Sequence, residues 1–581
     1  MFGLQIFIKQ NIENLITSVS CHRNYKFTNF RSHHYLLKRS VEITKCRPFI
    51  RCQSNKTGQQ KKIPLVLGIA GVSGVAIYSY YHFKNRLSND NSSRDSDDDD
   101  EFDTPFVYES LNEDLALLNN FGRIPYLLIG AGSASFTAFR AIRTNDPTAK
   151  VLMIGEESFF PYMRPPLSKE MWYGDNPDMA QMLSYQWNGK ERSLFYEPPD
   201  YYFTVKELLE NKNGGVSVMR GTKVVKIDPM SQIVYLKNGE KISYEKCLIA
   251  TGSKPKSLPV FQKVEDSIKK HITVFRTADD FKILDRISRK INSIVVVGGG
   301  FLGSELVYGL AKRGTSRGLK VVQLFPECGN MAKILPEYLS KWTSKFLQSE
   351  GIKIIPEVTV KSVSHEGSKI LLHLSNNEVI VTDHVVVAVG AEPNTEIAKD
   401  SGLEIDKTHG GFVVNAELEG RKNLWVAGDV SCFYDAKFGR RRVEHHDHAF
   451  VSGRLAGENM TGSGKPYLHQ SIFWSDLGPE IGYEAIGIVD SALPTVGIFA
   501  KPTETDTLES VDTNGQSIQS NSEQKIVNKG ESAEKCIQNT LKADDSYRKG
   551  IIFYFKDDVI VGIVLWNVFL KISVARKIIN E

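Results

Sequence analysis

Cysteine is sparse in this chain, and its spacing excludes several kinds of redox and metal chemistry. The 581 residues include seven cysteines: Cys21, Cys46, Cys52, Cys247, Cys328, Cys432 and Cys536. No two of them form a Cys-x-x-Cys pair, and none lies between Cys52 and Cys247. A redox-active pair, a zinc site or an iron–sulfur cluster would need closer spacings. Cys247 and Cys328, at the ends of apolar segments, are therefore interpreted as packing residues.

Excess positive charge is confined to the N-terminus. The net charge is +4, yet residues 1–62 contain twelve Lys and Arg and only two acids, Glu13 and Glu42. The remainder is slightly acidic, so bulk charge gives no argument for nucleic-acid binding. An acid-poor basic leader over 1–62 predicts a mitochondrial transit peptide, with a basic surface arm as the alternative.

Charge is absent from residues 63–81, an apolar run just long enough to span a bilayer. This run predicts a transmembrane helix, and a buried helix remains the alternative. Residues 82–111 follow it and contain an acidic stretch from Asp90 to Asp103. Such a composition cannot bury enough apolar surface to fold, so we expect a disordered linker.

Two glycine-rich turns, each between an apolar strand and a helix, are the most informative features present. The first is Gly130-Ala-Gly132-Ser-Ala-Ser135, and the second is Gly298-Gly-Gly300-Phe-Leu-Gly303. Glycines at these spacings permit a tight reversal and let the backbone approach a pyrophosphate at a helix N-terminus. Glu156 and Glu327 close the next strands, where they could accept hydrogen bonds from ribose hydroxyls. Together the turns predict two bound dinucleotides.

The order of the remaining strand–glycine segments distinguishes the two ligands. Residues 423–429 form an apolar strand that ends in Gly-Asp, and an Asp there could reach the ribityl chain of a flavin. Strands at 246–252 and 385–393 break at glycine, where the chain would cross between domains. This order resembles the two-dinucleotide-binding flavoprotein family, in which an NAD domain is inserted into an FAD domain.

The resemblance implies an α/β fold like that of glutathione reductase, with Rossmann-type FAD and NAD domains and an α+β C-terminal domain. Its predicted segments are an FAD domain in two parts (112–258 and 391–470), an NAD domain (259–390) and a C-terminal domain (471–581). Within the last, residues 502–546 are polar and predicted to be a disordered loop. The flanking segments 550–555 and 559–566 predict a hairpin that turns at Asp557-Asp558.

Further motifs are similar to those of the apoptosis-inducing-factor family. They include Phe160-Pro-Tyr-Met-Arg164-Pro-Pro-Leu-Ser-Lys169, Arg441-Arg-Val-Glu-His445-His446-Asp-His448 and Phe473-Trp474-Ser-Asp-Leu-Gly-Pro479. The resemblance runs from about residue 121 to 577. It implies an NADH oxidoreductase whose hydride transfer to FAD leaves a long-lived reduced charge-transfer complex. It also implies an inner-mitochondrial-membrane anchor, exposure to the intermembrane space, support of respiratory-chain biogenesis and, after release, caspase-independent death in the nucleus.

The family resemblance assigns the site residues of this chain. Lys169, Glu305, Phe301 and His445 are implied at the reacting centre, with Lys169 and Glu305 as an ion pair and Phe301 as a cover for the ring. FAD contacts are implied for Gly130, Ala131, Gly132, Ser133, Ala134, Glu156, Glu157, Arg164, Lys169, Val224, Arg276, Asp429, His445 and His446. NADH contacts are implied for Gly299, Gly300, Phe301, Leu302, Glu327, Lys333, Gly390 and Glu444. Contacts around the nicotinamide and with a second NAD molecule are implied for Trp187, Trp474, Glu484 and Asn567.

Structural alternatives accompany several of these assignments. Glu305 could be an exposed acid favoured by the helix dipole, and Phe301 or the tryptophans could simply be core residues. Glu327 argues against NADPH, because its carboxylate would repel a 2′-phosphate. The histidines at 445, 446 and 448 lack ligand spacing on a helix face, so no metal site is predicted.

The implied partners are less determined. The family docks an oxidative import receptor of the intermembrane space, binds DNA without sequence preference and dimerises on reduction. Lys246, Lys256 and the basic segment 437–442 resemble positions used for DNA contact and nuclear import, although the segment could be a solvated turn. Val413 replaces an arginine of the family's dimer contact. A redox-gated binding protein, or a reductase of a quinone or another small acceptor, remains an alternative function.

Overall fold

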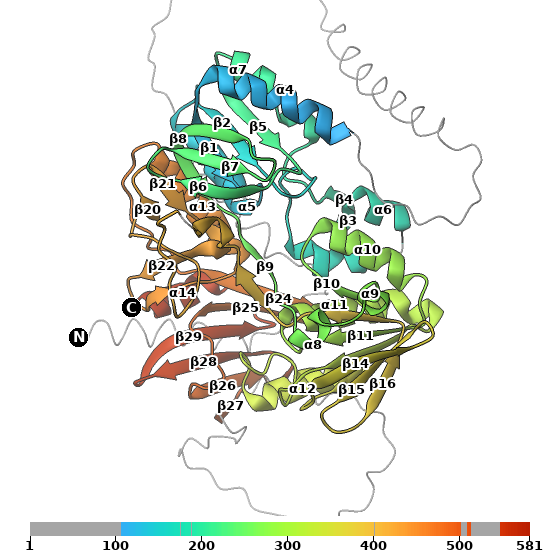
Figure 1. Cartoon of the computed structure of the whole chain (residues 1–581). Helices are drawn as coiled ribbons and strands as arrows, with labels where there is room; N and C mark the ends of the chain where they lie inside the picture. Colours follow the sequence, from blue (N-terminus) through green and yellow to red (C-terminus); the bar gives the residue numbers. More distant parts are fainter. Residues whose placement is uncertain (1–105, 175, 188, 400, 501–507, 513–546) are drawn as a thin grey trace, which may run out of the picture. The chain divides into compact units, whose positions relative to one another are not determined.

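The computed structural model describes residues 106–174, 176–187, 189–399, 401–500, 508–512 and 547–581 (Figure 1). The predicted leader (1–62), the predicted membrane span (63–81) and most of the predicted linker lie outside these residues. Among the described residues, no helix is both long and apolar enough to cross a bilayer.

The first sheet joins two distant parts of the chain. Its strand order is β20-β21-β8-β1-β2-β5, with β7 pairing β8 and β6 pairing β7. The bounds are β1 Arg123–Ile129, β2 Lys150–Ile154, β5 Gly215–Met219, β6 Val224–Asp228, β7 Ile233–Leu236, β8 Lys241–Ile249, β20 Glu419–Arg421 and β21 Leu424–Val426. Strands β21, β8, β1, β2 and β5 run parallel, and their apolar residues form one continuous core. Residues after 418 thus complete a sheet begun at residue 123.

Helices α5 (Ser133–Asn145) and α13 (His446–Met460) lie beside this sheet and pack closely against each other. Glycines make the close approach possible: a Cβ at Gly453 would lie 2.2 Å from the Ala134 carbonyl oxygen, and one at Gly457 would lie 2.3 Å from that of Ala138. The α5 N-terminus follows the first glycine turn, and the α13 N-terminus begins beside His445. The close crossing therefore sets the relative position of two predicted cofactor-binding segments.

Helix α4 corrects the predicted linker. The linker was expected to be disordered through residue 111, but α4 spans Phe106–Phe121. Leu115 and Leu118 are buried in the first core, and Leu111 packs against it. Their helical spacing anchors α4 to the domain, a tertiary contact that an assignment based on the preceding acidic run overlooked.

The second sheet has the order β10-β17-β11-β12-β13, all parallel. The bounds are β10 Ile272–Val274, β11 Ser293–Val297, β12 Lys320–Leu324, β13 Lys353–Ile355 and β17 His384–Val387. Its helices are α10 Ala278–Ser288, α11 Phe301–Gly314 and α12 Glu337–Ser349. A three-stranded antiparallel sheet, β14 Val360–Glu366, β15 Lys369–Leu374 and β16 Val379–Thr382, is inserted before β17. Each glycine turn thus follows a parallel strand, β1 or β11, as predicted.

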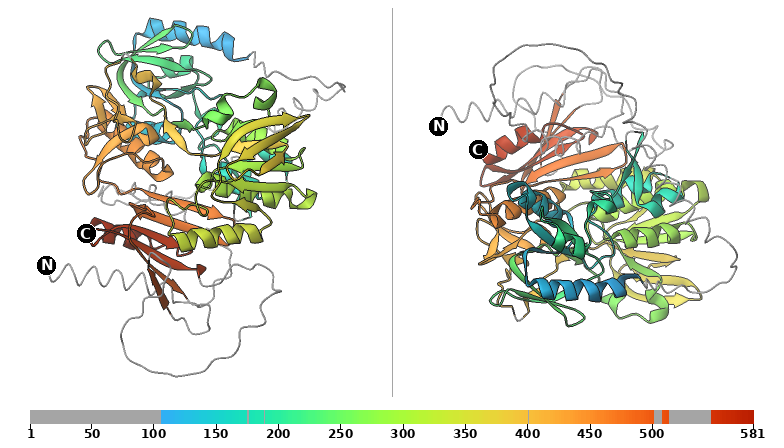
Figure 2. Two further views of the ribbon diagram at one scale, coloured as in Figure 1. Left: turned by 60° about the horizontal axis from the view of Figure 1, so that its bottom comes forward. Right: turned by 90° about the horizontal axis from the view of Figure 1, so that it is seen from above.

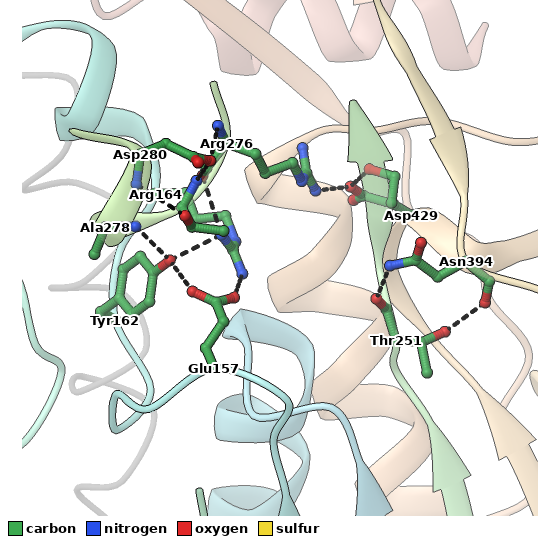
Figure 3. Close-up of polar contacts among 11 residues, drawn as sticks. Glu157, Tyr162, Arg164, Thr251, Arg276, Ala278, Asp280, Asn394 and Asp429 are labelled. Carbon is green, nitrogen blue, oxygen red and sulfur yellow. Dashed lines mark hydrogen bonds and ion pairs between the residues drawn. The ribbon is translucent and has the colours of Figure 1, made fainter. Parts of the chain in front are cut away.

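The chain crosses between the two sheets along a short ribbon. Strand β9 (Ser253–Pro255) pairs antiparallel with β18 (Ala391–Pro393). Beside it, Thr251 Oγ1 donates to the Asn394 carbonyl (2.8 Å) and Asn394 Nδ2 donates to the Thr251 carbonyl (2.9 Å) (Figure 3). The outgoing and returning segments are therefore held together where each leaves the first sheet.

The C-terminal sheet is antiparallel, in the order β24-β25-β29-β28-β26-β27. The bounds are β24 Ile472–Leu477, β25 Ile481–Gly487, β26 Thr495–Ala500, β27 Leu508–Asp512, β28 Gly550–Lys556 and β29 Val559–Trp566. Helix α14, Ile572–Asn580, contacts β25 and β29 (Figure 2). One sheet with a parallel centre and antiparallel additions, one all-parallel sheet and an antiparallel sheet with a helix confirm the predicted fold class.

Two expectations for this region have different outcomes. The predicted hairpin is confirmed, because β28 and β29 pair and turn at Asp557 and Asp558, both left-handed (φ 51° and 60°). The predicted disordered loop over 502–546 is wrong at Leu508–Asp512, where β27 pairs with β26. Polar composition did not reveal this strand, because an edge ladder uses backbone groups that any extended segment supplies. The other residues of that predicted loop lie outside the described residues.

We predict that Gly453→Ala lowers the free energy of unfolding by about 1–3 kcal/mol, because a methyl group cannot fit against the Ala134 carbonyl without backbone movement. Arg454→Ala is the matched control, since Arg454 lies on the same helix with its side chain 53% exposed. Chemical denaturation of both variants measures the difference. Equal stability of the two would show that α5 and α13 can separate freely.

Candidate functional site

A cavity of about 1190 Å³ lies where both parallel sheets and strand β24 meet. Its walls come from the first glycine turn, the segment after β2, the β9–β18 crossover, the N-terminus of α11 and the segment before α13. Of the predicted site residues, the following line it: Gly130, Ala131, Gly132, Ser133, Ala134, Glu156, Glu157, Arg164, Lys169, Val224, Arg276, Phe301, Leu302, Glu305, Asp429, Glu444, His445, His446 and Trp474. The following do not: Trp187, Gly299, Gly300, Glu327, Lys333, Gly390, Glu484 and Asn567.

The first glycine turn opens a helix end to the cavity. Gly130 has φ +101°, and a Cβ there would lie 2.3 Å from the Ala250 carbonyl oxygen of the neighbouring strand. At Gly132, by contrast, an added Cβ would have no protein atom within 4 Å. The unpaired N–H groups at the start of α5 therefore face open space, as a pyrophosphate requires. These residues fit the predicted FAD.

Arg164 ties the first sheet's loop to the second domain (Figure 3). Its guanidinium pairs with Glu157 and donates to Tyr162 Oη (2.9 Å) and to the Arg276 carbonyl (3.1 Å). The Ala278 amide in turn donates to Tyr162 Oη (3.1 Å). Because all five residues are joined, the loop after β2 and the segment before α10 form one wall of the cavity.

Asp429 is the acid that follows strand β21, three residues after its last residue, Val426. Its Oδ2 accepts hydrogen bonds from Arg276 (2.7 Å) and from Ser253 Oγ (2.7 Å). Burial opposes ionisation, but the Arg276 charge and these hydrogen bonds outweigh it, so the pKa of Asp429 is lower than its ordinary value. The carboxylate is therefore ionised at neutral pH and can accept a hydrogen bond from a ligand hydroxyl.

Lys169 and Glu305 form a buried ion pair, with Lys169 Nζ 2.7 Å from Glu305 Oε2 and side-chain exposures of 7% and 5%. Ser168 Oγ donates to Oε2 (2.5 Å), and Ser475 Oγ donates to Oε1 (2.7 Å). Burial lowers the pKa of Lys169, but Glu305 outweighs it, and the net pKa is raised. Glu305 is thus buried, so the alternative of an exposed helix-end acid is wrong.

Aromatic and imidazole rings continue the wall beside this pair. His445 stacks on Phe473 (ring centroids 4.7 Å apart), and Phe473 meets the edge of Phe301 (5.3 Å). Trp474 lies edge-on to His446 at 5.8 Å. Burial lowers the pKa of His445 and of His446 to about 4, so both are neutral at pH 7. An uncharged wall of aromatic and imidazole rings results, which suits contact with a ring system.

The second glycine turn repeats the first at the end of β11. Gly298 has φ +125°, and a Cβ there would lie 2.2 Å from the Ala388 carbonyl oxygen. A Cβ at Gly303 would lie 2.1 Å from the Gly298 carbonyl oxygen, so only glycine lets α11 approach the strand. Gly300 caps α11 and faces open space. Glu327 stands near Lys333, with Glu327 Oε1 3.3 Å from Lys333 Nζ.

The four residues predicted around the nicotinamide and a second NAD molecule do not line one cavity. Trp187 ends β3 (Ser184–Trp187) and packs against the core around α10 and α11. Asn567 follows β29 and donates to the Glu480 and Arg548 carbonyls. Glu484, on β25 directly opposite Trp474, is buried, and burial raises its pKa to about 7. Only Trp474 of this group reaches the cavity, so the second NAD site stays a prediction.

The arginines of the basic segment 437–442 are bonded to the rest of the fold, whereas Lys437 is exposed in a turn. Arg440 donates to the Val414 and Cys432 carbonyls, and Arg441 pairs with Asp435. Arg442 donates to the His409 and Asp429 carbonyls and pairs with Glu444. Lys437 bonds the Ile579 carbonyl. The solvated interpretation is wrong for the arginines, because a run of charged residues gives no sign of which backbone carbonyls will bond to it.

Sequence reasoning missed the residues that orient the predicted ones. Ser168 and Ser475 hold Glu305, while Ser253 holds Asp429. Ser253 could have been found, because it follows β8 and the carboxyl ends of parallel strands share one edge. No comparable signal exists for Ser475, which lies 170 residues from Glu305. Within the described residues, no cluster of His, Cys, Asp and Glu could hold a metal ion.

Comparison with known proteins agrees with this geometry. Residues 125–453 match the pyridine nucleotide-disulphide oxidoreductase family, and residues 456–581 match the C-terminal domain of apoptosis-inducing factor, mitochondrion-associated. The chain is 50% identical over 467 residues to a putative mitochondrial apoptosis-inducing factor 1 of Drosophila melanogaster, covering 79% of this chain and 63% of that protein. It is 35% identical to mitochondrial apoptosis-inducing factor 1 of Dictyostelium discoideum, covering 78% of each.

A ferredoxin reductase from Rhodopseudomonas palustris has a similar solved structure. Its TM-score is 0.58 at 23% identity, and the likeness covers 77% of this chain and 91% of that one. At this identity the likeness establishes the fold and nothing further.

Glu305→Ala is expected to lower the free energy of unfolding by about 3–5 kcal/mol, because it leaves the Lys169 charge buried and unpaired. Adding Lys169→Met should recover part of this loss. Lys465→Ala, which breaks the exposed pair with Glu458, is the control and should change stability little. A urea-denaturation double-mutant cycle measures the coupling, and additive losses would contradict a buried ion pair.

His448 predicts a pH-dependent stability. It is fully buried between Tyr467 Oη and Ser431 Oγ, and burial lowers its pKa from 6.5 to about 3. The unfolded chain therefore binds this proton more readily, and stability falls as the pH drops from 6.5 toward 3. His448→Gln should remove the contribution of one proton to the slope of the unfolding free energy against pH, which is up to about 1.4 kcal/mol per pH unit. Parallel pH–stability curves for variant and wild type would refute the assignment.

Proposed function

The chain belongs to the pyridine nucleotide-disulphide oxidoreductase family, in its apoptosis-inducing-factor branch, and is an FAD-dependent oxidoreductase; on that premise we propose that it oxidises NADH by hydride transfer to FAD. The observation that carries the proposal is the buried Lys169–Glu305 pair. The pair lies in a cavity lined by the first glycine turn and by the N-terminus of α11, the helix that follows the second turn.

FAD bound in this cavity supplies the hydride acceptor. The protein contributes position and electrostatics. The N–H groups at the start of α5 receive a pyrophosphate, and ionised Asp429 accepts a hydrogen bond from a hydroxyl-bearing chain. Lys169, held charged by Glu305, stabilises negative charge that develops near it in a water-poor site. The transfer needs no general acid or base, because stacking on a preformed surface supplies the geometry.

NADH is favoured over NADPH as the donor. Glu327 stands after β12, at the position equivalent to the ribose-binding acid of dinucleotide folds, and a second negative charge there would be repelled. Phe301 occupies the junction between the cavity and the second turn. We propose that its ring moves aside when the nicotinamide enters.

The wider role follows by analogy with the relatives. We propose a mitochondrial protein, supported by the leader over 1–62 and by the names of both relatives. Anchoring in the inner membrane facing the intermembrane space rests on residues 63–81. We further propose that the reduced complex is long-lived, that the protein docks an import receptor and that it supports respiratory-chain biogenesis. The proposal also includes cell death after release of the protein from mitochondria, DNA binding and redox-dependent dimerisation. For DNA contact, Lys256 is exposed, whereas Lys246 is bonded to the Met460 carbonyl.

Anaerobic titration of the purified flavoprotein with NADH tests the activity. We expect the flavin absorbance to bleach with NADH and to remain nearly unchanged with the same concentration of NADPH. A persistent long-wavelength band that decays slowly in air would support the long-lived complex. Rapid reoxidation would instead favour turnover with a small acceptor such as a quinone. A protein that binds no flavin, or whose flavin NADH does not bleach, would refute the proposal.

A further inference from the structure

A cluster of polar side chains lies buried beneath the second glycine turn. Gln323 on β12, Ser304 on α11, Asn330 and Ser340 are each 0% exposed, and Ser344 on α12 is 8% exposed. We call these five residues the amide–serine cluster. Burying so many polar groups costs free energy unless each finds a partner, and an apolar core would avoid that cost. Their presence therefore calls for an explanation beyond stability.

Asn330 is the centre of the cluster, and its donors and acceptors are all used. Its Nδ2 donates to Ser304 Oγ (2.8 Å) and to Gln323 Oε1 (2.8 Å). Its Oδ1 accepts a hydrogen bond from Ser344 Oγ (2.7 Å). The backbone N–H of Asn330 donates to the same Ser344 Oγ (2.9 Å). Its carbonyl accepts from Ser340 Oγ (2.7 Å). A side chain bonded on every side cannot shift without breaking several bonds at once.

The cluster holds the carbonyl groups of the turn. Gln323 Nε2 donates to the Gly298 carbonyl (2.9 Å). The Gly299 carbonyl accepts from the amide of Met331, the residue after Asn330, at 2.7 Å, and from Ser304 Oγ at 3.4 Å. Within a planar trans peptide, the N–H points opposite to the C=O. Holding these carbonyls inward therefore turns the N–H groups of Gly299 and Gly300 outward, toward the open space beside Gly300.

The first turn offers an internal comparison, because the two sheets have matching registers. Ile129 pairs with Ile154 in the first, as Val297 pairs with Leu324 in the second. Met153 therefore occupies the place of Gln323. Counting from the helix caps Gly132 and Gly300, Phe136 likewise occupies the place of Ser304. Met153 and Phe136 are buried apolar residues, so the first turn has apolar side chains at both of these positions.

We propose that the amide–serine cluster positions the second turn for the pyrophosphate of NADH and thereby sets the affinity for that dinucleotide. The inference rests on the proposed function and adds positioning residues to it. A dinucleotide that stays bound holds its own turn in shape through its phosphates. A dinucleotide that enters and leaves in each cycle meets an empty turn, and the protein must then keep the N–H donors aligned.

Gln323→Met tests this, because it installs the residue found beneath the first turn. We expect the KM for NADH and the Kd for ADP-ribose, which carries the pyrophosphate without nicotinamide, each to rise about tenfold. The rate of flavin reduction at saturating NADH should stay within about twofold, and the flavin content should not change. Reduction by reduced nicotinamide riboside, which has no phosphate, should proceed at the wild-type rate.

Two further variants keep the test decisive. Ser288→Ala removes a buried hydroxyl of the same domain that bonds only its own helix, at the Asp285 carbonyl, and should leave ADP-ribose binding unchanged. Ser304→Ala replaces Gln323→Met if that variant does not fold, with the same direction expected. Unchanged ADP-ribose affinity in a folded cluster variant, or an equal loss with the riboside, would overturn the inference. A wild-type protein that NADH does not reduce would refute the proposed function instead, and ADP-ribose binding would still decide this one.

Discussion

The buried pair of Lys169 and Glu305 is the constraint on which the arrangement of the three sheets depends. A lysine and a carboxylate removed from water lose several kcal/mol of solvation each, and only close pairing with further hydrogen bonds offsets this. Here the lysine comes from the loop after β2, the glutamate from α11 and the supporting Ser475 from β24. If any one of these regions moved away, a buried charged group in another region would lose a partner. The cavity between them therefore has a fixed wall at Lys169, where we propose that charge develops during hydride transfer.

The two glycine turns show how one local geometry is adapted to two tasks. In both, the first glycine takes a left-handed conformation against the carbonyl that follows a neighbouring parallel strand, Ala250 after β8 or Ala388 after β17. The packing around them differs: Ala131 lies against Gly155 in the first, whereas Gly299 lies against the Phe325 ring in the second. The turn supplies the side chain and the following strand the glycine in the first case, and the reverse holds in the second, where the side chain is Phe325. Together with the polar floor of the second turn, this exchange shows that a shared motif does not imply a shared mechanical role.

Sequence alone predicted what depends on local pattern. Both turns, the Asp557-Asp558 hairpin and the parallel strands follow from glycine spacing and apolar runs, and the structure contains all of them. The Lys169–Glu305 pair was expected only from the family resemblance, because nothing in the sequence relates residues 136 positions apart. Strand β27 and the start of α4 were missed, because each depends on a tertiary partner rather than on its own composition. The amide–serine cluster was missed for the same reason.

Charge balance around Lys169 limits what the lysine can do. Glu305 already neutralises it, yet Glu170 and Asp476 also stand close enough to act on it electrostatically. Burial raises the pKa of both acids, which favours their protonated forms over a concentration of negative charge. Negative charge that arrives with a hydride would then meet Lys169 with less opposing charge from Glu170 and Asp476 than two ionised carboxylates would supply.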